Sequence, residues 1–275
     1  MLKMKNQKEK SFTLLELLVV IAIIAILAAT VMVSLNSTRQ SAQEARGLKF
    51  SQNIKSTLAT DLVAEWTFDS VDIQGTTVKD TSGNNNNGTI NGGATSTQGK
   101  VRQALNLDGT DDYVRVLHST SLNITNAITI EAWIKLAEDR EQSIVRKENA
   151  YLTKSFNNPS GLSFYLYINS DWRTVNSNYR ATDYNWHHLV GTYDSNEKVL
   201  KVYVDGALKN SSTLSDLSSY LIDSNNNNLF LGSNNGTSEF FKGILDEVRI
   251  YSRALTAYEI KALYAQGKMR HLAER

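Results

Sequence analysis

A run of oxygen-bearing side chains, DTSGNNNNG, occupies residues 80–88 of this 275-residue sequence. It offers one carboxylate, two hydroxyls, four amides and flexible backbone carbonyls. Calcium takes about six to eight hard oxygen ligands, so the segment is a candidate calcium loop. It is not an EF-hand, because no Gly stands at the sixth position and no Glu at the twelfth. The alternative is an ordinary turn capped by Asp80, and the residues leave both interpretations open.

The sequence shows no clear arrangement of catalytic residues. Glycoside hydrolysis needs two carboxylates that flank one sugar. Asp246 and Glu247 are adjacent, so on a strand they would point to opposite faces, and Glu131 stands alone in its segment. The four histidines lack zincin spacing, and the chain has no G-x-S-x-G motif and no cysteine. We therefore expect no enzymatic activity.

One carboxylate, Glu16, interrupts a long apolar segment. Leu17–Leu35 adds 19 uncharged residues, nearly enough at about 1.5 Å per residue to cross a hydrocarbon core of about 30 Å. Four lysines within residues 1–11 favour a cytoplasmic N-terminus, with the rest of the chain outside. The alternative, a cleaved secretory signal peptide, fits poorly because the apolar run is long. With no Lys, Arg or His between Phe12 and Asn36, the partner of Glu16 would be a new N-terminal amine made by cleavage just upstream.

The string SFTLLELLVVIAIIAIL, residues 11–27, resembles the class III signal of type IV pilins and type II secretion pseudopilins. The resemblance implies that a prepilin peptidase cuts before Phe12 and that the new amine is N-methylated. It also implies that Glu16 neutralises the amine of a neighbouring subunit during filament assembly. Gly normally precedes the cut, whereas Ser11 stands there in this chain. Because serine is small, we expect cleavage to survive.

Beyond the apolar segment the chain divides into a connecting segment and a head. Residues 36–62 carry a weak apolar stripe with good helix formers, which predicts a helical extension and linker. From residue 63, short apolar and β-branched runs alternate with Asn, Gly, Ser and Asp clusters, which predicts strands. The expected strands are Ala64–Phe68, Ala104–Leu107, Tyr113–Val116, Ile128–Leu136, Ser143–Arg146, Leu162–Ile168, Trp186–Tyr193, Val199–Val204, Leu229–Gly232 and Phe241–Ile250.

Two local signals fix details of the head. Asp205-Gly206 after an apolar strand predicts a tight hairpin turn. Thr256 followed by Glu259 predicts a capping box at the start of one short closing helix. Gly267 is expected to end that helix as its C-cap.

Seven segments of the head, in this order, resemble a laminin G-like (LamG-like) jelly-roll domain of the concanavalin A-like lectin/glucanase superfamily. They are AEWTFD (64–69), DTSGNNNNGTI (80–90), ALNLDGTDDYV (104–114), ITIEAWIK (128–135), WHHLVGTYD (186–194), KVYVDGAL (201–208) and ILDEVRIYSRALTAYEI (244–260). The resemblance implies a mainly β fold, a two-sheet antiparallel jelly-roll sandwich, preceded here by a long N-terminal transmembrane helix. It implies function only loosely, because the fold hosts lectins, protein binders, structural modules and glycanases. Glycanases of this superfamily often carry E-x-D-x-x-E on one strand, and this chain has no such string.

The expected organisation has five parts. They are a prepilin leader (1–11), a transmembrane and assembly helix (12–35), a helical extension and linker (36–62), a LamG-like jelly-roll domain (63–267) and a C-terminal tail (268–275).

The resemblance also suggests calcium as a cofactor. In LamG-like relatives a calcium ion is often held by an aspartate of the early loop and by the aspartate of the DEVRIY strand. The matching residues here are Asp80 and Asp246, with Asn84 and Asn87 as further candidate ligands.

A ligand site is expected where aromatic rings lie beside hydrogen-bonding groups, as in segment 169–186. The candidate ligand-binding residues are Trp172, Tyr179 and Tyr184, and further loop candidates are Tyr151 and the Asn225–Asn228 run. Trp172 could instead pack within a hairpin. Nucleic acid is not expected as a partner, because the net charge is +1 and removal of residues 1–11 would lower it to −2.

These observations predict a single-pass protein of the bacterial cytoplasmic membrane whose head lies outside the cytoplasm. A prepilin peptidase would process it, and other pilin-like subunits would take it into a type IV pilus or a secretion pseudopilus at the cell surface. Its head would bind a carbohydrate or a surface protein without turnover. The alternatives are a pseudopilin that engages a secreted substrate, and a membrane-anchored LamG-like lectin that does not polymerise.

Overall fold

The computed structural model describes residues 14–15, 17–28, 31–32, 53–54 and 56–273, with side chains as far as Lys268. The chain divides into two compact units, residues 1–49 and 50–275. In the first unit the described residues are helical, and their large apolar side chains are 45–81% exposed. The segment expected to form the N-terminal helix is thus helical at each of its described residues. Among the described residues, no helix combines the length and the apolar character needed to span a membrane.

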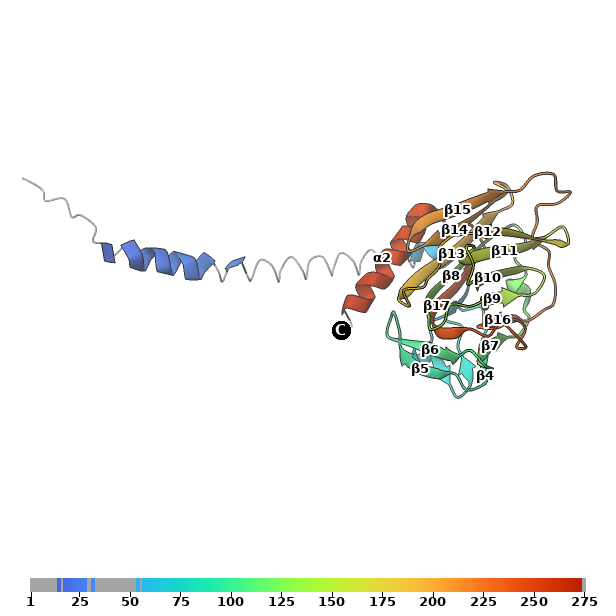
Figure 1. Cartoon of the computed structure of the whole chain (residues 1–275), viewed down its shortest axis with the longest axis horizontal. Coiled ribbons are helices and arrows are strands. Elements are labelled where there is room, and N and C mark those ends of the chain that lie inside the picture. Colours follow the sequence, from blue (N-terminus) through green and yellow to red (C-terminus); the bar gives the residue numbers. More distant parts are fainter. Residues whose placement is uncertain (1–13, 16, 29–30, 33–52, 55, 274–275) are drawn as a thin grey trace, which may run out of the picture. The chain divides into compact units, whose positions relative to one another are not determined.

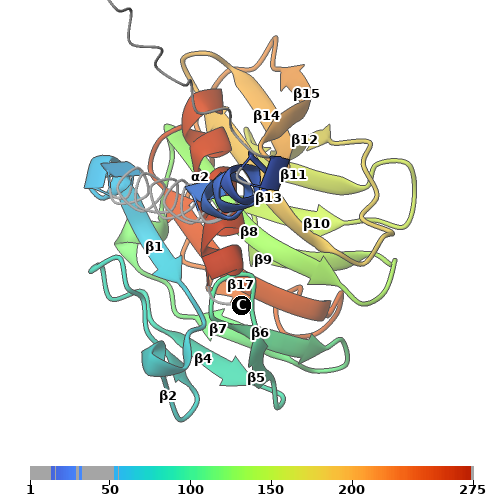
Figure 2. The same cartoon turned by 90° about the vertical axis from the view of Figure 1, so that its left-hand side faces the viewer.

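The second unit is a sandwich of two antiparallel sheets, as expected from the sequence (Figures 1 and 2). The eight-stranded sheet has the spatial order β15 (Ala207–Thr213), β14 (Val199–Val204), β13 (Trp186–Asp194), β8 (Ala127–Leu136), β17 (Lys242–Tyr251), β6 (Gln103–Asp108) and β5 (Thr95–Gln98), with β1 (Leu62–Trp66) paired to β17. The nine-stranded sheet has the order β12 (Asp171–Asn176), β11 (Leu162–Ile168), β10 (Tyr151–Ser155), β9 (Gln142–Lys147), β16 (Leu229–Leu231), β7 (Tyr113–Val116), β4 (Gly88–Asn91), β3 (Thr77–Val78) and β2 (Ile73–Gln74). Two 3₁₀ turns, Ser70–Asp72 and Thr120–Leu122, lie between strands.

Alternation along the strands explains the main core. On β8 the buried residues Ile128, Ile130 and Ile134 belong to one large apolar cluster, and Phe164 and Leu166 of β11 join it from the other sheet. Successive side chains of a strand point to opposite faces, so the residues between these project outward. The interior of the sandwich is therefore filled by alternate residues from both sheets.

A helix and the end of the connecting segment cover the outer face of the eight-stranded sheet. Helix α2 spans Ala257–Ala273 (Figure 2). Thr256 and Glu259 form the expected capping box, because Glu259 Oε2 accepts from the Thr256 N–H at 2.8 Å and Thr256 Oγ1 accepts from the Glu259 N–H at 3.3 Å. A second apolar cluster joins these elements: Ile54, Leu58, Val190, Tyr203, Tyr251, Leu255, Ile260, Ala262 and Leu263.

The expectation that Gly267 ends the closing helix as its C-cap is wrong. The helix runs on to Ala273, so Gly267 lies inside it. A Cβ at Gly267 would lie 2.5 Å from Cζ2 of the Trp133 indole. The glycine is therefore required by the close approach of the helix to Trp133 rather than by a turn.

The ten expected strands are all present, with ends shifted by at most two residues. The hairpin turn after β14 is also confirmed, since Asp205 and Gly206 have φ of 54° and 74°, as a type I′ turn requires. The strands that were not expected include the edge strands β2, β5 and β12. Edge strands have one unpaired side and face solvent, so they are short and polar and give no apolar alternation to detect.

Candidate functional site

The residues that the pilin resemblance assigns to processing and assembly are Ser11, Phe12 and Glu16. All three lie outside the described residues. The neighbouring residues 14–15 and 17–28 are helical and apolar, as an assembly helix requires. The roles of the three residues stay predictions.

The carboxylate of Asp80 accepts hydrogen bonds from backbone N–H groups of its own loop and of β1. Its Oδ1 accepts from the N–H groups of Glu65 at 3.0 Å and Ser82 at 2.9 Å, and its Oδ2 accepts from the Asn86 N–H at 2.9 Å. The Asp80 N–H in turn donates to Asn87 Oδ1 at 2.8 Å. Asp80 is buried, and these contacts are those of a residue that caps a turn and ties it to β1.

The amides of the same loop hold β1 in place. Asn84 Nδ2 donates to the carbonyls of Leu62 and Val63 at 3.0 and 3.1 Å. Asn86 is buried and donates from Nδ2 to the Val63 carbonyl at 2.9 Å. Its own carbonyl accepts from Nε1 of Trp66 at 2.9 Å. The asparagine run therefore connects the first strand of the head to the opposite sheet.

Asp246 lies in a different environment. Its Oδ2 accepts from the Val101 N–H at 2.9 Å, while its buried Oδ1 has no hydrogen-bond partner. Burial, and then the charge of Glu247, raise the pKa of Asp246 well above its usual value. Asp80 and Asp246 share no hydrogen-bond partner among the described residues. A calcium ion shared between Asp80 and Asp246 stays a prediction. The hydrogen bonds of Asp80 favour the alternative, in which Asp80 caps the turn.

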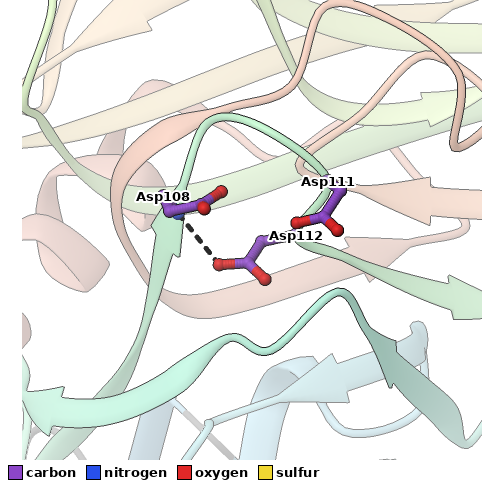
Figure 3. A group of neighbouring side chains, drawn as sticks. All are labelled: Asp108, Asp111 and Asp112. Atoms are coloured by element: carbon purple, nitrogen blue, oxygen red, sulfur yellow. Dashed lines mark hydrogen bonds between the residues drawn. The ribbon is translucent and has the colours of Figure 1, made fainter.

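A third acidic group, in the turn between β6 and β7, was not predicted as a site. Carboxylate oxygens of Asp108, Asp111 and Asp112 lie within 4.8 Å of one another (Figure 3). Asp112 is buried and its Oδ2 accepts from the Asp108 N–H at 3.0 Å. Burial, helped by the charges of the other two aspartates, raises the pKa of Asp112. The signal that the sequence offered was the presence of three aspartates within five residues.

Glu131 is not isolated, as its sequence neighbourhood suggested, but belongs to a buried charge cluster. Arg249 lies 2.7 Å from Glu65 and 3.1 Å from Glu131, and its Nη2 also pairs with Glu247. All four side chains are less than 10% exposed. A bulge between Asp246 and Arg249, with Glu247 at φ 48°, breaks the simple alternation expected for this strand. The cluster thereby ties β1, β8 and β17 together.

His188 and Tyr251 complete the surroundings of Glu131. His188 Nε2 lies 3.0 Å from Glu131 Oε1, and the Tyr251 hydroxyl donates to Oε2 at 3.2 Å. Burial opposes ionisation, but the charge of Arg249 and the contact with His188 outweigh it and lower the pKa of Glu131. The His188 ring lies 5.0 Å from that of Trp133. These are buried structural contacts.

His187 holds the loop that bears two of the candidate ligand residues. Its Nε2 is 2.7 Å from Asp183 Oδ1, and its Nδ1 is 2.9 Å from Asp205 Oδ2. Burial disfavours the charged ring, but the hydrogen bonds to Asp205 and Asp183 prevail and raise the pKa of His187. The Tyr179 ring lies edge-on to His187 at 5.3 Å, and Tyr184 is 46% exposed. Tyr179 and Tyr184 thus belong to a loop that this histidine anchors.

Trp172 belongs to a separate group. It lies on β12, where its ring is 5.1 Å from Tyr167 and 6.5 Å from Tyr165, both on β11. It therefore packs across a hairpin and is also partly exposed. Tyr151 was wrongly expected in an exposed loop, because it is a buried residue of β10 whose hydroxyl donates to the Leu122 carbonyl at 3.0 Å.

The Asn225–Asn228 run is engaged in holding a buried lysine. Lys147 Nζ donates to the carbonyls of Asn225 and Asn227, and burial lowers its pKa to about 8. Asn227 Nδ2 donates to the Glu148 carbonyl at 3.0 Å, and Asn228 Oδ1 accepts from the His118 N–H at 2.9 Å. These contacts indicate that the asparagine run holds Lys147 and shapes its own loop.

Two sequence-family models match the chain, in agreement with both resemblances. One, described as the concanavalin A-like lectin/glucanases superfamily, matches residues 108–261. The other, the prokaryotic N-terminal methylation motif, matches residues 6–32. No curated protein sequence matches the chain significantly.

Solved structures with the same fold include a domain of an arabinanase, the binding domain of a mosquitocidal protein and a botulinum neurotoxin. Domain 4 of AbnA, a GH43 extracellular arabinanase from Geobacillus stearothermophilus in complex with arabinotriose, has 24% identity over 74% of this chain and 98% of its own, with a TM-score of 0.60. The binding domain of Paraclostridial Mosquitocidal Protein 1 has 19% identity over 75% and 52%, with a TM-score of 0.60. A structure of botulinum neurotoxin type C, whose cell entry depends on interaction with two ganglioside molecules, has 16% identity over 76% and 52%, with a TM-score of 0.58. At these identities the likeness establishes the fold alone.

Proposed function

The chain belongs to the concanavalin A-like lectin/glucanases superfamily and carries a prokaryotic N-terminal methylation motif, and from these two facts we propose that it is a pilin-like subunit with a binding head. The motif implies processing by a prepilin peptidase and anchoring in the membrane. In the proposal, the processed N-terminal helix enters a type IV pilus or a secretion pseudopilus. The head then lies outside the cytoplasm and contacts a glycan or a surface protein.

The observation that carries this proposal is the fusion itself. An assembly signal at residues 6–32 precedes a compact head, residues 50–275, that has its own cores. Glycan is the ligand class that the structural comparisons support, since one similar domain holds arabinotriose and a similar toxin depends on gangliosides. Binding of this kind needs only a surface on the head and no reaction.

Binding without turnover is supported by the state of the buried carboxylates. A glycosidase needs two carboxylates that face one sugar. Glu65, Glu131 and Glu247 instead surround Arg249 in a site with less than 10% exposure of each side chain. Incubation of the protein with polysaccharides should release no new reducing ends.

The mature N-terminus, measured by mass spectrometry on protein from membranes and from sheared surface material, tests the assembly part. We expect a chain that starts at methylated Phe12. An intact Met1 start would overturn it and leave a membrane-tethered lectin. Ser11→Gly should speed the cleavage, because it restores the residue that normally precedes the cut.

Assembly itself is tested by Glu16→Ala, with Glu9→Ala as the matched control. Both variants lose one carboxylate, but processing removes Glu9 from the mature chain. We expect Glu16→Ala to insert into the membrane yet fail to reach the sheared surface fraction, while Glu9→Ala assembles normally. Equal assembly of both variants would contradict the proposed role of Glu16.

A further inference from the structure

The outer face of the nine-stranded sheet carries a row of side chains that the sites above do not use. The cross-strand register joins, in one line, Thr174 (β12), Tyr165 (β11), Leu152 (β10), Arg146 (β9), Phe230 (β16) and Arg115 (β7). Directly paired residues of antiparallel strands project from the same face. Phe164 and Leu166, on either side of Tyr165, lie in the core, so the row faces outward. Five interstrand spacings of about 4.8 Å give the row a length of about 24 Å.

One end of the row is aromatic. Phe156, Tyr165, Tyr167 and Trp172, here called the tryptophan cluster, are all partly exposed. The Trp172 ring meets Tyr167 at 66° and Tyr165 at 83°, and the Phe156 and Tyr165 rings lie 6.2 Å apart. Edge-to-face neighbours fix the orientation of the indole before any ligand arrives. The cluster is therefore a preorganised apolar surface with polar tips.

The middle of the row is ionic, and its charges are paired with one another. Arg146 lies 2.6 Å from Glu148 and 3.5 Å from Glu239, while Lys154 lies 2.6 Å from Glu141 and 2.9 Å from Glu239. These five residues are called the ion-pair network. The side chains of Arg146 and Lys154 are only 11% and 9% exposed, so they are held in place. An anionic ligand would have to displace the carboxylates, whereas a neutral ligand can use the remaining donors and acceptors.

We propose that this face, from the tryptophan cluster to the ion-pair network, binds a neutral oligosaccharide chain of several units. A sugar ring has an apolar C–H face, which packs on an aromatic ring, and an edge of hydroxyls, which suits fixed carboxylate and guanidinium groups. An apolar peptide would remove water from the ion-pair network and offer its charged groups no hydrogen bonds in return, which is costly. The inference deepens the proposed function and rests on it in so far as the head is a binding module.

The position of the face in the sandwich suits display. Ile54 and Leu58, which end the connecting segment, pack with α2 in the apolar cluster on the outer face of the eight-stranded sheet. The two sheets are stacked, so their outer faces point in opposite directions. The proposed binding face therefore points away from the place where the connecting segment joins the head.

The test uses the full-length chain in a detergent without a sugar headgroup, on an array of neutral and acidic oligosaccharides. The neutral probes are gluco-, xylo-, manno-, galacto- and arabino-oligosaccharides of several lengths, and the acidic probes are uronic-acid oligomers. We expect binding to at least one neutral series, stronger for longer chains. Trp172→Ala should weaken it about tenfold or more. Thr174→Trp, which fills an exposed position beside Tyr165 without touching the core, should do the same.

Two further variants place the site. Tyr258→Ala is the matched control, because Tyr258 is an exposed aromatic residue (69%) on α2, and it should bind as the unmodified chain does. Loss of binding in Tyr184→Ala, with Trp172→Ala and Thr174→Trp unaffected, would move the site to the His187-anchored loop and overturn the inference. Preference for uronic-acid oligomers would overturn it as well. Capture of surface protein with no binding to any neutral oligosaccharide would overturn the inference yet leave the proposed binding head intact, and an intact Met1 start would bear only on the pilin assignment.

Discussion

Arg249 is the residue whose loss should cost the head most, because one buried cation serves three buried carboxylates. The guanidinium contacts Glu65 at 2.7 Å and Glu131 at 3.1 Å and also pairs with Glu247. Removal of one partner from a single buried ion pair costs about 3–5 kcal/mol, because a desolvated charge is left behind. Arg249→Met removes the cation that all three carboxylates contact, so we expect the upper end of that range. Small domains have about 5–15 kcal/mol in total, so the variant should be barely folded at pH 7.

The pH dependence separates this explanation from a simple loss of packing. In the unmodified chain the pKa of Glu131 is lowered, so its contribution is present above its unfolded pKa of about 4.3 and is lost as the pH falls through the lower folded value. Without Arg249, burial dominates and raises the pKa of Glu131, so the variant gains stability as the pH falls from 7 toward 5. The difference in unfolding free energy between the two proteins should therefore shrink on acidification.

Urea unfolding of the full-length protein in micelles, followed by tryptophan fluorescence at pH 5 and pH 7, measures both effects. Arg115→Met is the matched control, because Arg115 is exposed on β7 and its loss should cost about 0.5 kcal/mol or less. A loss below about 1 kcal/mol in Arg249→Met, or a difference that stays constant between the two pH values, would refute the reasoning.

Three further predictions concern other parts of the head. Gly267→Ala should lower the unfolding free energy by about 1–2 kcal/mol in urea titrations although alanine favours helices, because the new Cβ would lie 2.5 Å from the Trp133 ring. The pKa of His187 is raised in the fold, so the stability that its charged form contributes is complete below its unfolded pKa of about 6.5 and is lost as the pH rises through the folded value. The difference in melting temperature between the unmodified chain and His187→Gln should therefore be larger at pH 5.5 than at pH 8.5. Because backbone N–H groups occupy both oxygens of Asp80, we expect EDTA to leave the melting temperature unchanged, whereas a calcium-dependent rise that Asp246→Asn abolishes would support the calcium site.

The sequence predicts best those strands in which apolar core residues occupy every second position. Leu162–Ile168 and Val199–Val204 were predicted to the residue, because core-facing apolar side chains occur at every second position. The edge strand Asp171–Asn176 has mostly polar residues, so nothing in its composition distinguishes it from a loop. Gly267 gives a second example. Its local sequence predicts a helix end, but the glycine is needed for the close approach of the helix to Trp133, a residue more than 130 positions away.

The chemistry of the candidate sites depends on contacts that are distant in the sequence. Glu65 and Arg249 are 184 residues apart, and no spacing rule connects them. Asp80 carried two open interpretations because an Asn- and Gly-rich loop can offer its oxygens to a metal or to its own N–H groups. Only the direction of those N–H groups, which depends on the packing of β1, favours the second interpretation.

A head that holds a ligand while its chain is anchored elsewhere must carry the load through β1, because β1 is the first strand after the connecting segment. Two ionic contacts secure that strand. Arg249 binds Glu65 within it, and Arg253 joins Asp61, at 2.6 Å, to Glu259 of α2, at 2.7 Å. β1 pairs with β17 antiparallel and in register from residue 64 to residue 66, so tension along it is shared by several hydrogen bonds at once. The buried charges around Arg249 thus hold the strand that follows the connecting segment, and the binding face that we propose is the opposite outer face.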